Sequence, residues 1–554
     1  MYKLFLSLRY LRSKVLAYFA VLSVALCVFM LLLVVSVMNG FLEQIEAAAK
    51  GLHGDIVVES NTLSGLGRYD KLSAELEKVE HARSASPFIL TFGILRMPGT
   101  DYRQTVQVAG IRLPERAHVS DFEKGLFVQK DVEEPTWDPP LEKVLERLRS
   151  EISRTQAMLD TVTGDGETDL PPEKADLARR LRTAISFQSD AAYTIERAAE
   201  HRDELREIQQ RLSTAPAGAT DEELIELSER RDALIQRGIH PPRYRMILGL
   251  GIPGLSFRSE DGRTVRLVSP GHEIELVLAP LGRRLAMSEV APNRAMFTVI
   301  DDCTTDVWSV DKNIVYVPFE TLQELNNMAA EYSADDPSKQ VIPARCSAIH
   351  VKVDERLTRE RDLRPIRDEV HRVVARFQRD HPDAMPTGVS VQTWRQRQQD
   401  VIAPIEKQRT LTVIMFSIMS TAMVFLILVI FYSIVVQKTR EIGLLKAVGA
   451  THGGVAGIFL GYGIAVGVVG SIIGTVGGYY FVRNINPIQD WVDSTFGFRV
   501  WERDVFMFEQ IPNEMDWTAA ALVVAGAIVA GLLGAIIPAI RAARMQPVEA
   551  LRYE

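Results

Sequence analysis

Four long apolar runs interrupt a chain of otherwise mixed polarity. They lie at Val15–Met38, Leu411–Val436, Val455–Val482 and Thr518–Ile540, and none of them contains Asp, Glu, Lys or Arg. A helix rises about 1.5 Å per residue, so about 20 residues cross the ~30 Å hydrocarbon core of a bilayer. The pattern therefore predicts four transmembrane helices, one before and three after a large polar region.

Within the polar region, short runs rich in β-branched and aromatic residues alternate with helical patterns. This alternation predicts a large α/β domain. Strands are predicted at 55–59, 88–97, 105–111, 274–278, 295–299, 314–317 and 348–353, and helices at Tyr69–Val79, Phe319–Glu331 and Leu363–Asp380.

Residues 141–237 do not follow this alternation of strands and helices. Apolar residues from Leu141 to Ile152 follow helical spacing, and 173–213 contains neither Gly nor Pro. Thr220 and Glu223 form a capping box that opens a further helix. Pro-Pro pairs precede and follow the segment, as expected for an inserted module. We predict a helical, coiled-coil-like arm, which either binds a partner or serves as a spacer.

The net charge of −8 says little, because the charges are unevenly distributed. By the positive-inside rule, both termini and the loop at 437–454 are predicted to be cytoplasmic, and the large domain and the acid-rich 483–516 loop external. The first run is too long for a signal peptide and is predicted to be retained. Residues 1–14 are either an interfacial helix or a simple basic flank. The basic residues that set this topology are Lys3, Arg9, Arg12, Lys14, Lys438, Arg440, Lys446, Arg541, Arg544 and Arg552.

These patterns divide the chain into eleven parts. The fold class is an α-helical membrane protein with four transmembrane helices and a large periplasmic α/β domain that carries the helical insertion. The parts are a cytoplasmic interfacial helix (1–14), TM1 (15–38), the α/β domain (39–135), the arm (136–242), the rest of the domain (243–410), TM2 (411–436), a cytoplasmic loop (437–454), TM3 (455–482), a periplasmic loop (483–516), TM4 (517–541) and a cytoplasmic tail (542–554).

Motifs for catalysis are missing from the sequence. It contains no G-x-x-x-x-G-K-[ST], H-E-x-x-H, C-x-x-C or G-x-S-x-G. We therefore expect no catalytic residues, no metal site and no nucleotide bound by this chain. Basic residues are interleaved with acidic ones, which argues against nucleic acid. Cys303 and Cys346 either pair in an oxidising compartment or remain unpaired buried thiols.

The third run is crowded with glycine, and several glycines are four residues apart, for example Gly463 and Gly467. Such spacing lets two helix backbones approach closely. The glycine spacing generally indicates tight packing between helices, and a dimer interface between permease subunits is one particular form of such packing. Pro538 is expected to weaken or kink the fourth helix.

Three segments and the chain's last residues together resemble one family. SVMNGF at 36–41 closes the first run, a Trp segment at 394–407 leads into the second, and QKTREIGLLKAVGA fills 437–450, while PVEALRYE occupies 547–554. This pattern resembles the permease subunits of lipoprotein-releasing ABC transporters, the LolC/LolE kind, within the wider MacB and FtsX permease family. The resemblance covers the chain except for the arm, which the familiar subunits lack.

The resemblance implies three kinds of site. The cytoplasmic loop would couple to an ATPase, although an ordinary basic connector is the alternative. The outer end of the first helix would border lateral access for acylated lipoproteins, and a segment at 280–292 would hook a periplasmic chaperone, unless it is a plain exposed hairpin. The coupling residues are Lys438, Thr439, Arg440, Glu441, Ile442, Gly443, Leu444, Leu445 and Lys446. The lateral-access residues are Val37, Met38, Asn39, Gly40 and Phe41, and the hook residues are Pro280, Leu281, Gly282, Arg283, Arg284, Leu285, Met287 and Pro292.

The resemblance also implies partners. They are a cytoplasmic ABC ATPase dimer that uses ATP and Mg, a second permease subunit (identical or paralogous), the lipoprotein substrate, membrane lipid and a periplasmic chaperone. The chain itself would be a non-catalytic subunit of the bacterial inner membrane. Two other functions stay open: an efflux permease of the MacB kind, and an FtsX-like signalling scaffold that regulates cell-wall hydrolysis.

Overall fold

The computed structural model forms two compact units. Unit 1 comprises Met1–Glu46 and Gln399–Glu554, and unit 2 comprises Ala47–Gln398. The residues that the structure describes are 15–62, 65–120, 122–130, 132–164, 171–213, 225–231, 244–259, 264–279, 292–305, 308–332, 340–354, 356–357, 359–382, 388–497, 501 and 511–546.

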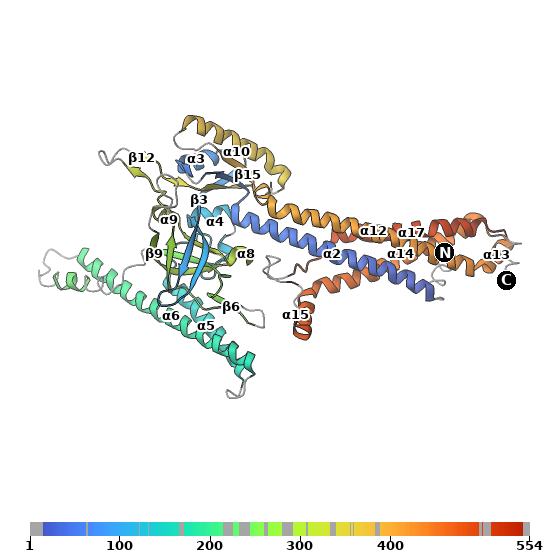
Figure 1. Ribbon diagram of the computed structural model, residues 1–554, viewed down its shortest axis with the longest axis horizontal. Helices are drawn as coiled ribbons and strands as arrows, with labels where there is room; N and C mark the ends of the chain where they lie inside the picture. Colours follow the sequence, from blue (N-terminus) through green and yellow to red (C-terminus); the bar gives the residue numbers. More distant parts are fainter. Residues whose placement is uncertain are drawn as a thin grey trace. The chain divides into compact units, whose positions relative to one another are not determined.

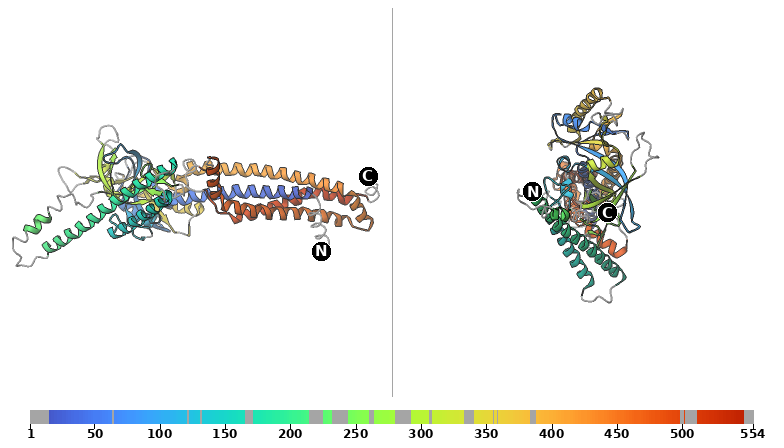
Figure 2. Two further views of the ribbon diagram at one scale, coloured as in Figure 1. Left: turned by 90° about the horizontal axis from the view of Figure 1, so that it is seen from below. Right: turned by 90° about the vertical axis from the view of Figure 1, so that its left-hand side faces the viewer.

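Unit 1 is built on four long helices that lie side by side (Figures 1 and 2). Each contains a stretch that is long and apolar enough to cross a membrane, namely Tyr18–Glu46, Ile402–Gln437, His452–Arg483 and Trp517–Arg544. The prediction of four apolar helices is thus confirmed. Their bounds are α2 (Val15–His53), α12 (Gln399–Gln437), α14 (His452–Arg483) and α17 (Trp517–Arg544), and two shorter helices, α13 (Thr439–Ala447) and α15 (Ile485–Phe496), join them.

One glycine stripe on α14 packs against two different helices. A Cβ added at Gly463 would lie 2.6 Å from the Cβ of Ala535 on α17. About three turns further on, a Cβ at Gly474 would lie 2.5 Å from the carbonyl oxygen of Ala25 on α2. The glycines therefore serve close backbone contact within the chain. α17 continues past Pro538 to Arg544.

The core of unit 2 is a closed mixed barrel. The sheet order is β15-β1-β14-β3-β4-β10-β5-β9-β8, and β3 also pairs with β8, so six strands from β3 to β8 form a ring. β10–β4 and β5–β9 are parallel pairs, and the other pairs in the ring are antiparallel. The ring strands are β3 (Ala82–Arg96), β4 (Arg103–Ile111), β5 (Arg245–Gly249), β8 (Glu273–Leu278), β9 (Asn293–Cys303) and β10 (Ile314–Pro318).

The remaining three strands extend the sheet beyond the barrel from the first half of β3. These strands are β14 (Ala348–Val353), β1 (Ile56–Ser60) and β15 (Val389–Thr393). Helix α10 (Glu360–Asp380) covers this extension with its apolar side, whose residues Leu363, Ile366, Val370, Val374 and Phe377 are buried.

The other elements of unit 2 outside the arm are shorter. The helices are α3 (Tyr69–Leu76), α4 (Leu113–Val119), η1 (Phe122–Gly125), α8 (Trp308–Asp311), α9 (Phe319–Leu325) and α11 (Trp394–Arg397). The short strands are β2 (Leu66–Gly67), β6 (Ser256–Arg258), β7 (Thr264–Arg266), β11 (Glu331–Tyr332), β12 (Gln340–Ile342) and β13 (Arg345–Cys346).

The inserted segment contains two long helices, α5 (Leu141–Thr163) and α6 (Pro172–Ser213). Near the start of α5, Val144 packs with Ile195, and near its end Met158 packs with Leu181. The two helices are therefore antiparallel. Both clusters also include a residue outside the two helices, Val128 in one and Val265 in the other, so α5 and the part of α6 that pairs with it pack against the rest of unit 2.

Some predicted boundaries differ from the structure. The helix predicted at Phe319–Glu331 ends at Leu325, because Asn327 takes a left-handed φ of 54° and β11 begins at Glu331. The helix of the first apolar run continues to His53. Cys303 and Cys346 are both buried and neither forms a disulfide. The predicted helix at 1–14 and the Thr220–Glu223 capping box lie outside the described residues.

Candidate functional site

The predicted coupling loop folds as α13, whose inner side is fixed to the helices beside it. Ile442 is buried in a cluster with Val435, Val455 and Ala542. Thr439 and Gly443 are also buried, and the Thr439 hydroxyl donates to the carbonyl of Val436 at 2.8 Å. Ile442 therefore belongs to the internal packing of unit 1.

Lys446 has an internal role as well. Its Nζ donates to the carbonyl oxygens of Ala543, at 2.7 Å, and Met545, at 2.5 Å. These carbonyls lie at the end of α17, where backbone acceptors lack helical partners and a cation is favourable. Lys446 therefore ties the end of α13 to the end of α17. At the other end of α13, Lys438 forms an ion pair with Glu441.

The outer side of α13 combines charge with exposed apolar surface. Arg440 and Glu441 are exposed, and so are Leu444 (56 %) and Val448 (83 %). These positions recur at helical spacing, opposite the buried ones. Large exposed aliphatic side chains at a helix surface are the kind of anchor that a protein partner can cover. Among the nine predicted coupling residues, Arg440, Glu441 and Leu444 are the exposed ones, and Lys438, Leu445 and Lys446 are half-buried.

The segment of α2 at 39–41 is held by the loop between α14 and α17. The Asn39 side chain donates to Oδ2 of Asp516 at 2.7 Å, and the ring of Phe41 lies edge-on to Trp501 at 5.9 Å. A Cβ at Gly40 would lie 2.5 Å from the Cβ of Pro512. Glycine thus permits this contact, and three adjacent residues of the predicted lateral-access segment meet one loop. Val37 and Met38 are half-buried.

Asp516 serves two elements at once. Its Oδ1 accepts the N–H groups of Thr518, at 2.9 Å, and Ala519, at 3.0 Å, and so caps α17. Its Oδ2 accepts from Asn39. The N–H of Ala519 makes the largest contribution to lowering the pKa of Asp516, against the opposing effect of desolvation, and the Thr518 and Asn39 donors lower it further. A single carboxylate therefore links α2 to the start of α17.

Replacing Gly40 by valine is expected to lower the free energy of unfolding by about 1–3 kcal/mol, the usual cost of overpacking. The added Cβ would collide with the ring of Pro512, whose own Cβ cannot rotate away. Thermal unfolding of the purified chain in nanodiscs measures the loss. Gly526→Val is the matched control, because a Cβ at Gly526 has nothing within 4 Å. Equal melting temperatures for both variants would contradict the contact.

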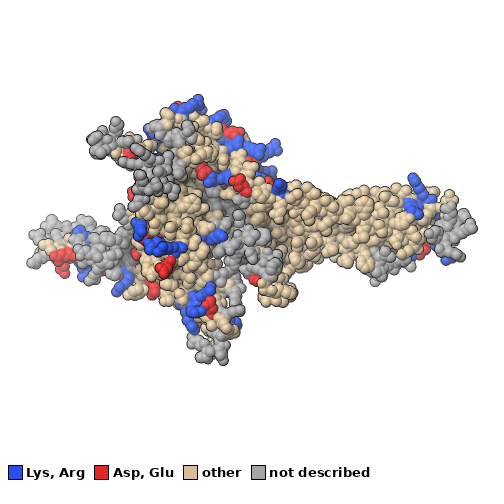
Figure 3. All heavy atoms as spheres, viewed as in Figure 1, with Lys and Arg blue, Asp and Glu red and all other residues tan. Residues whose placement is uncertain are grey.

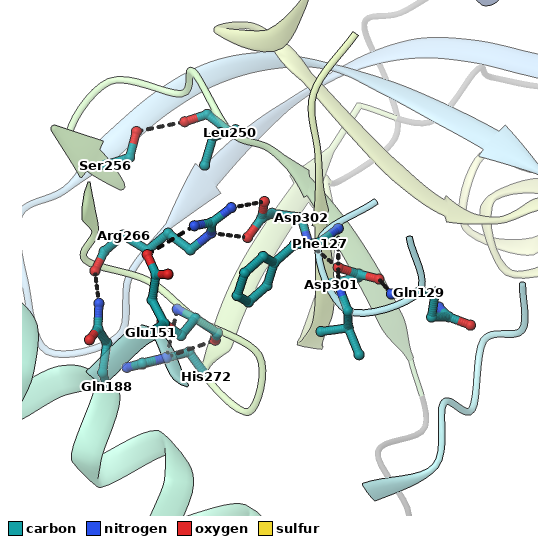
Figure 4. Close-up of polar contacts among 12 residues, drawn as sticks. Phe127, Gln129, Glu151, Gln188, Leu250, Ser256, Arg266, His272, Asp301 and Asp302 are labelled. Carbon is teal, nitrogen blue, oxygen red and sulfur yellow. Dashed lines mark hydrogen bonds and ion pairs between the residues drawn. The ribbon is translucent and has the colours of Figure 1, made fainter. Parts of the chain in front are cut away.

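A buried ionic network joins the helix pair to the barrel (Figure 4). Arg266 donates from Nε to Oδ2 of Asp302 at 2.6 Å and from Nη1 to Oε1 of Glu151 at 3.0 Å. Glu151 lies on α5 and Asp302 on β9, and both are buried. Burial alone would lower the pKa of Arg266, but Asp302 and then Glu151 outweigh it and raise the pKa. Gln188 of α6 adds a bond to the Arg266 carbonyl at 2.9 Å.

The neighbouring Asp301 fixes the chain where it approaches α5. Its carboxylate accepts the N–H groups of Phe127, Val128 and Gln129 at 2.8–3.1 Å. Complete burial, and next the charge of Asp302, raise the pKa of Asp301 to about 7. Spacing alone gave no sign of this network, because its members are distant in sequence.

The predicted hook falls almost entirely outside the described residues, which on this segment include only Pro292, an exposed residue. The strands that precede and follow it, β8 and β9, pair antiparallel as far as Leu278 and Asn293. Within the described part of the chain, no group of three or more His, Cys, Asp or Glu side chains could hold a metal ion.

Comparisons with known proteins find similar sequences among transporter permeases. Residues 413–547 match the FtsX-like permease C-terminal domain. A lipoprotein-releasing system transmembrane protein LolC of Xylella fastidiosa is 27 % identical over 164 residues, which is 30 % of this chain and 40 % of that protein. A LolC of Neisseria meningitidis is 22 % identical over 334 residues, 60 % of this chain and 71 % of that protein. A macrolide export protein MacB of Chlorobaculum tepidum is 32 % identical over 120 residues, 22 % of this chain and 15 % of that protein.

These matches confirm the predicted resemblance to ABC transporter permeases of the lipoprotein-releasing kind, within a wider family that includes MacB. The match to the Xylella protein spans less than half of that protein's length.

Proposed function

We propose that this chain is a permease subunit of a lipoprotein-releasing ABC transporter. It would couple ATP hydrolysis by a separate ATPase to the extraction of lipoproteins from the outer leaflet of the inner membrane. The single observation that carries this proposal is the extent of the match to the Neisseria LolC, which covers 60 % of the chain, whereas the MacB match covers 22 %. The 60 % match is too long for the C-terminal domain alone to account for it.

In this proposal, unit 1 lies in the inner membrane with both termini in the cytoplasm, and unit 2 is periplasmic. The exposed side of α13, with Leu444 and Val448, receives the ATPase dimer. ATP and Mg are bound by that partner, and this chain is not catalytic. A second permease subunit, identical or paralogous, completes the transporter.

The outer end of α2 would border the lateral access of the lipoprotein. Support comes from the contacts of Asn39, Gly40 and Phe41, through which the α14–α17 loop holds this part of the helix. Extraction of a lipoprotein would need energy, because transfer of each acyl CH₂ from lipid to water costs about 0.8 kcal/mol. The hook segment at 280–292 would then receive a soluble periplasmic chaperone.

Depletion of the protein is expected to trap a mature, acylated outer-membrane lipoprotein in the inner membrane. Membrane fractionation with a tagged lipoprotein measures this. Normal sorting after complete depletion, in a strain without a paralogue, would overturn the proposal. Sensitivity to drugs or peptides would instead indicate efflux of the MacB kind, and unseparated cells would indicate the FtsX-like role that the domain match keeps open.

A further inference from the structure

Aromatic side chains mark one end of unit 1. Tyr479 on α14 lies 5.7 Å from the ring of Trp517, the first residue of α17, and 5.6 Å from Tyr480. Tyr480 and Trp517 are 63 % and 64 % exposed. Arg483 donates to the Tyr479 hydroxyl at 2.8 Å. Exposed Tyr and Trp with a cation beside them are typical of the boundary between the hydrocarbon core and water. This end of α14 therefore lies at the surface of the bilayer.

Helix α15 begins two residues after Arg483 and is amphipathic. Ile485, Ile488, Val492 and Phe496 recur at helical spacing, with Trp491 beside them. Asn486, Asp490, Asp493 and Ser494 occupy the other side. Figure 1 shows α15 turned across the direction of α14.

The apolar side of α15 is only partly covered by the described residues, since Ile485, Ile488 and Val492 are half-buried. None of the helix's residues is buried, and Trp491 and Phe496 are 60 % and 69 % exposed. The two rings contact each other at 6.1 Å, so they form one aromatic surface. Water would be a poor environment for this surface, which needs an apolar partner.

Two hydrogen bonds fix α15 to the loop that holds α2. The Asn486 side chain donates to the Ile511 carbonyl and accepts the Ile511 N–H, both at 3.0 Å. Ile511 directly precedes Pro512, which contacts Gly40. A surface that binds α15 would therefore also position the loop residues, such as Pro512, that contact α2 at Gly40.

We propose that α15 lies in the interfacial layer of the bilayer, with Trp491 and Phe496 inserted among the lipids. Three observations favour lipid over a protein partner. The helix begins at the aromatic boundary, it turns across the direction of the span, and its exposed apolar side carries a Trp, the residue most suited to this layer. α15 thus anchors the α14–α17 loop, and through it the end of α2, to the membrane surface. This inference needs only a membrane location and stands independently of the proposed substrate.

Site-directed spin labels test the position of α15. Trp491→Cys and Phe496→Cys report on the apolar side, and Ser494→Cys, also exposed, is the matched control on the polar side. The labels are placed in the full chain with Cys27, Cys303 and Cys346 replaced by alanine, reconstituted in vesicles of phosphatidylethanolamine and phosphatidylglycerol. Collision with lipid-soluble oxygen is compared with collision with a water-soluble nickel complex.

We expect the labels at 491 and 496 to collide more with oxygen than with nickel, and the label at 494 to show the reverse. Preferential nickel access at all three positions would place α15 in water and overturn the proposal. Protection of 491 and 496 from both reagents would mean that protein covers this side, which also overturns it. Two apolar-side positions keep the test decisive if one variant does not fold.

Discussion

Leu444→Glu is expected to reduce association with the ATPase about 10- to 100-fold and to abolish lipoprotein release in cells. Truncating a hot-spot side chain at a protein interface costs about 2 kcal/mol or more, and about 1.4 kcal/mol corresponds to tenfold in affinity. A carboxylate at this position would also have to lose its water in the interface. The fold of the chain itself should tolerate the change, because Leu444 is 56 % exposed.

Co-purification of the chain with the proposed ATPase partner, together with the fractionation assay, measures this effect. Leu444→Met is the matched control, since it keeps an apolar side chain of similar size. Ile442→Ala gives the contrast, because Ile442 is buried in unit 1 and its loss should lower the melting temperature. Unchanged ATPase binding by a folded Leu444→Glu chain would show that the partner docks elsewhere.

Arg266→Met is expected to destabilise unit 2 by about 3–5 kcal/mol, the range seen when one member of a buried ion pair is removed. Asp302 and Glu151 would keep their charges in a buried site without the guanidinium that both now contact. Hydrogen exchange of the full chain should show faster exchange in α5 and α6.

The triple variant Arg266→Met, Glu151→Gln, Asp302→Asn is the matched control, since it removes the charges together and should recover much of the stability. If the single variant exchanges like the wild type, the network does not hold the helix pair to the barrel.

The sequence could predict the elements of this fold better than their assembly. The four spans are evident because their apolar runs lack charge, and β10 and β14 were evident from β-branched runs. Closure of the barrel by pairing β3 with β8 joins residues about 180 apart, such as Gly93 and Leu278, and no local pattern encodes it. α15 was missed, although the spacing of Ile485, Ile488, Val492 and Phe496 contains it.

The candidate sites show the same division. Ile442 and Leu444 are two residues apart in a helix and so point to nearly opposite sides, which the sequence alone could have indicated. That Lys446 binds the last carbonyls of α17, and that Gly40 meets Pro512, depends on how distant helices pack. Those roles could be found only once the helices were placed together.

The glycine stripe of α14 also limits how this gene can change. Gly463 and Gly467 face α17, Gly470 and Gly474 face α2, and one side of a single helix serves both. Losing or gaining one codon between Gly467 and Gly470 would turn everything beyond it by about 100°, since 3.6 residues make one turn. Substitutions at neighbouring exposed positions such as Ile472 and Ile473 leave the stripe intact, but a frame-preserving insertion would not. Related sequences should therefore differ by substitutions along α14, whereas insertions and deletions within α14 should be rare.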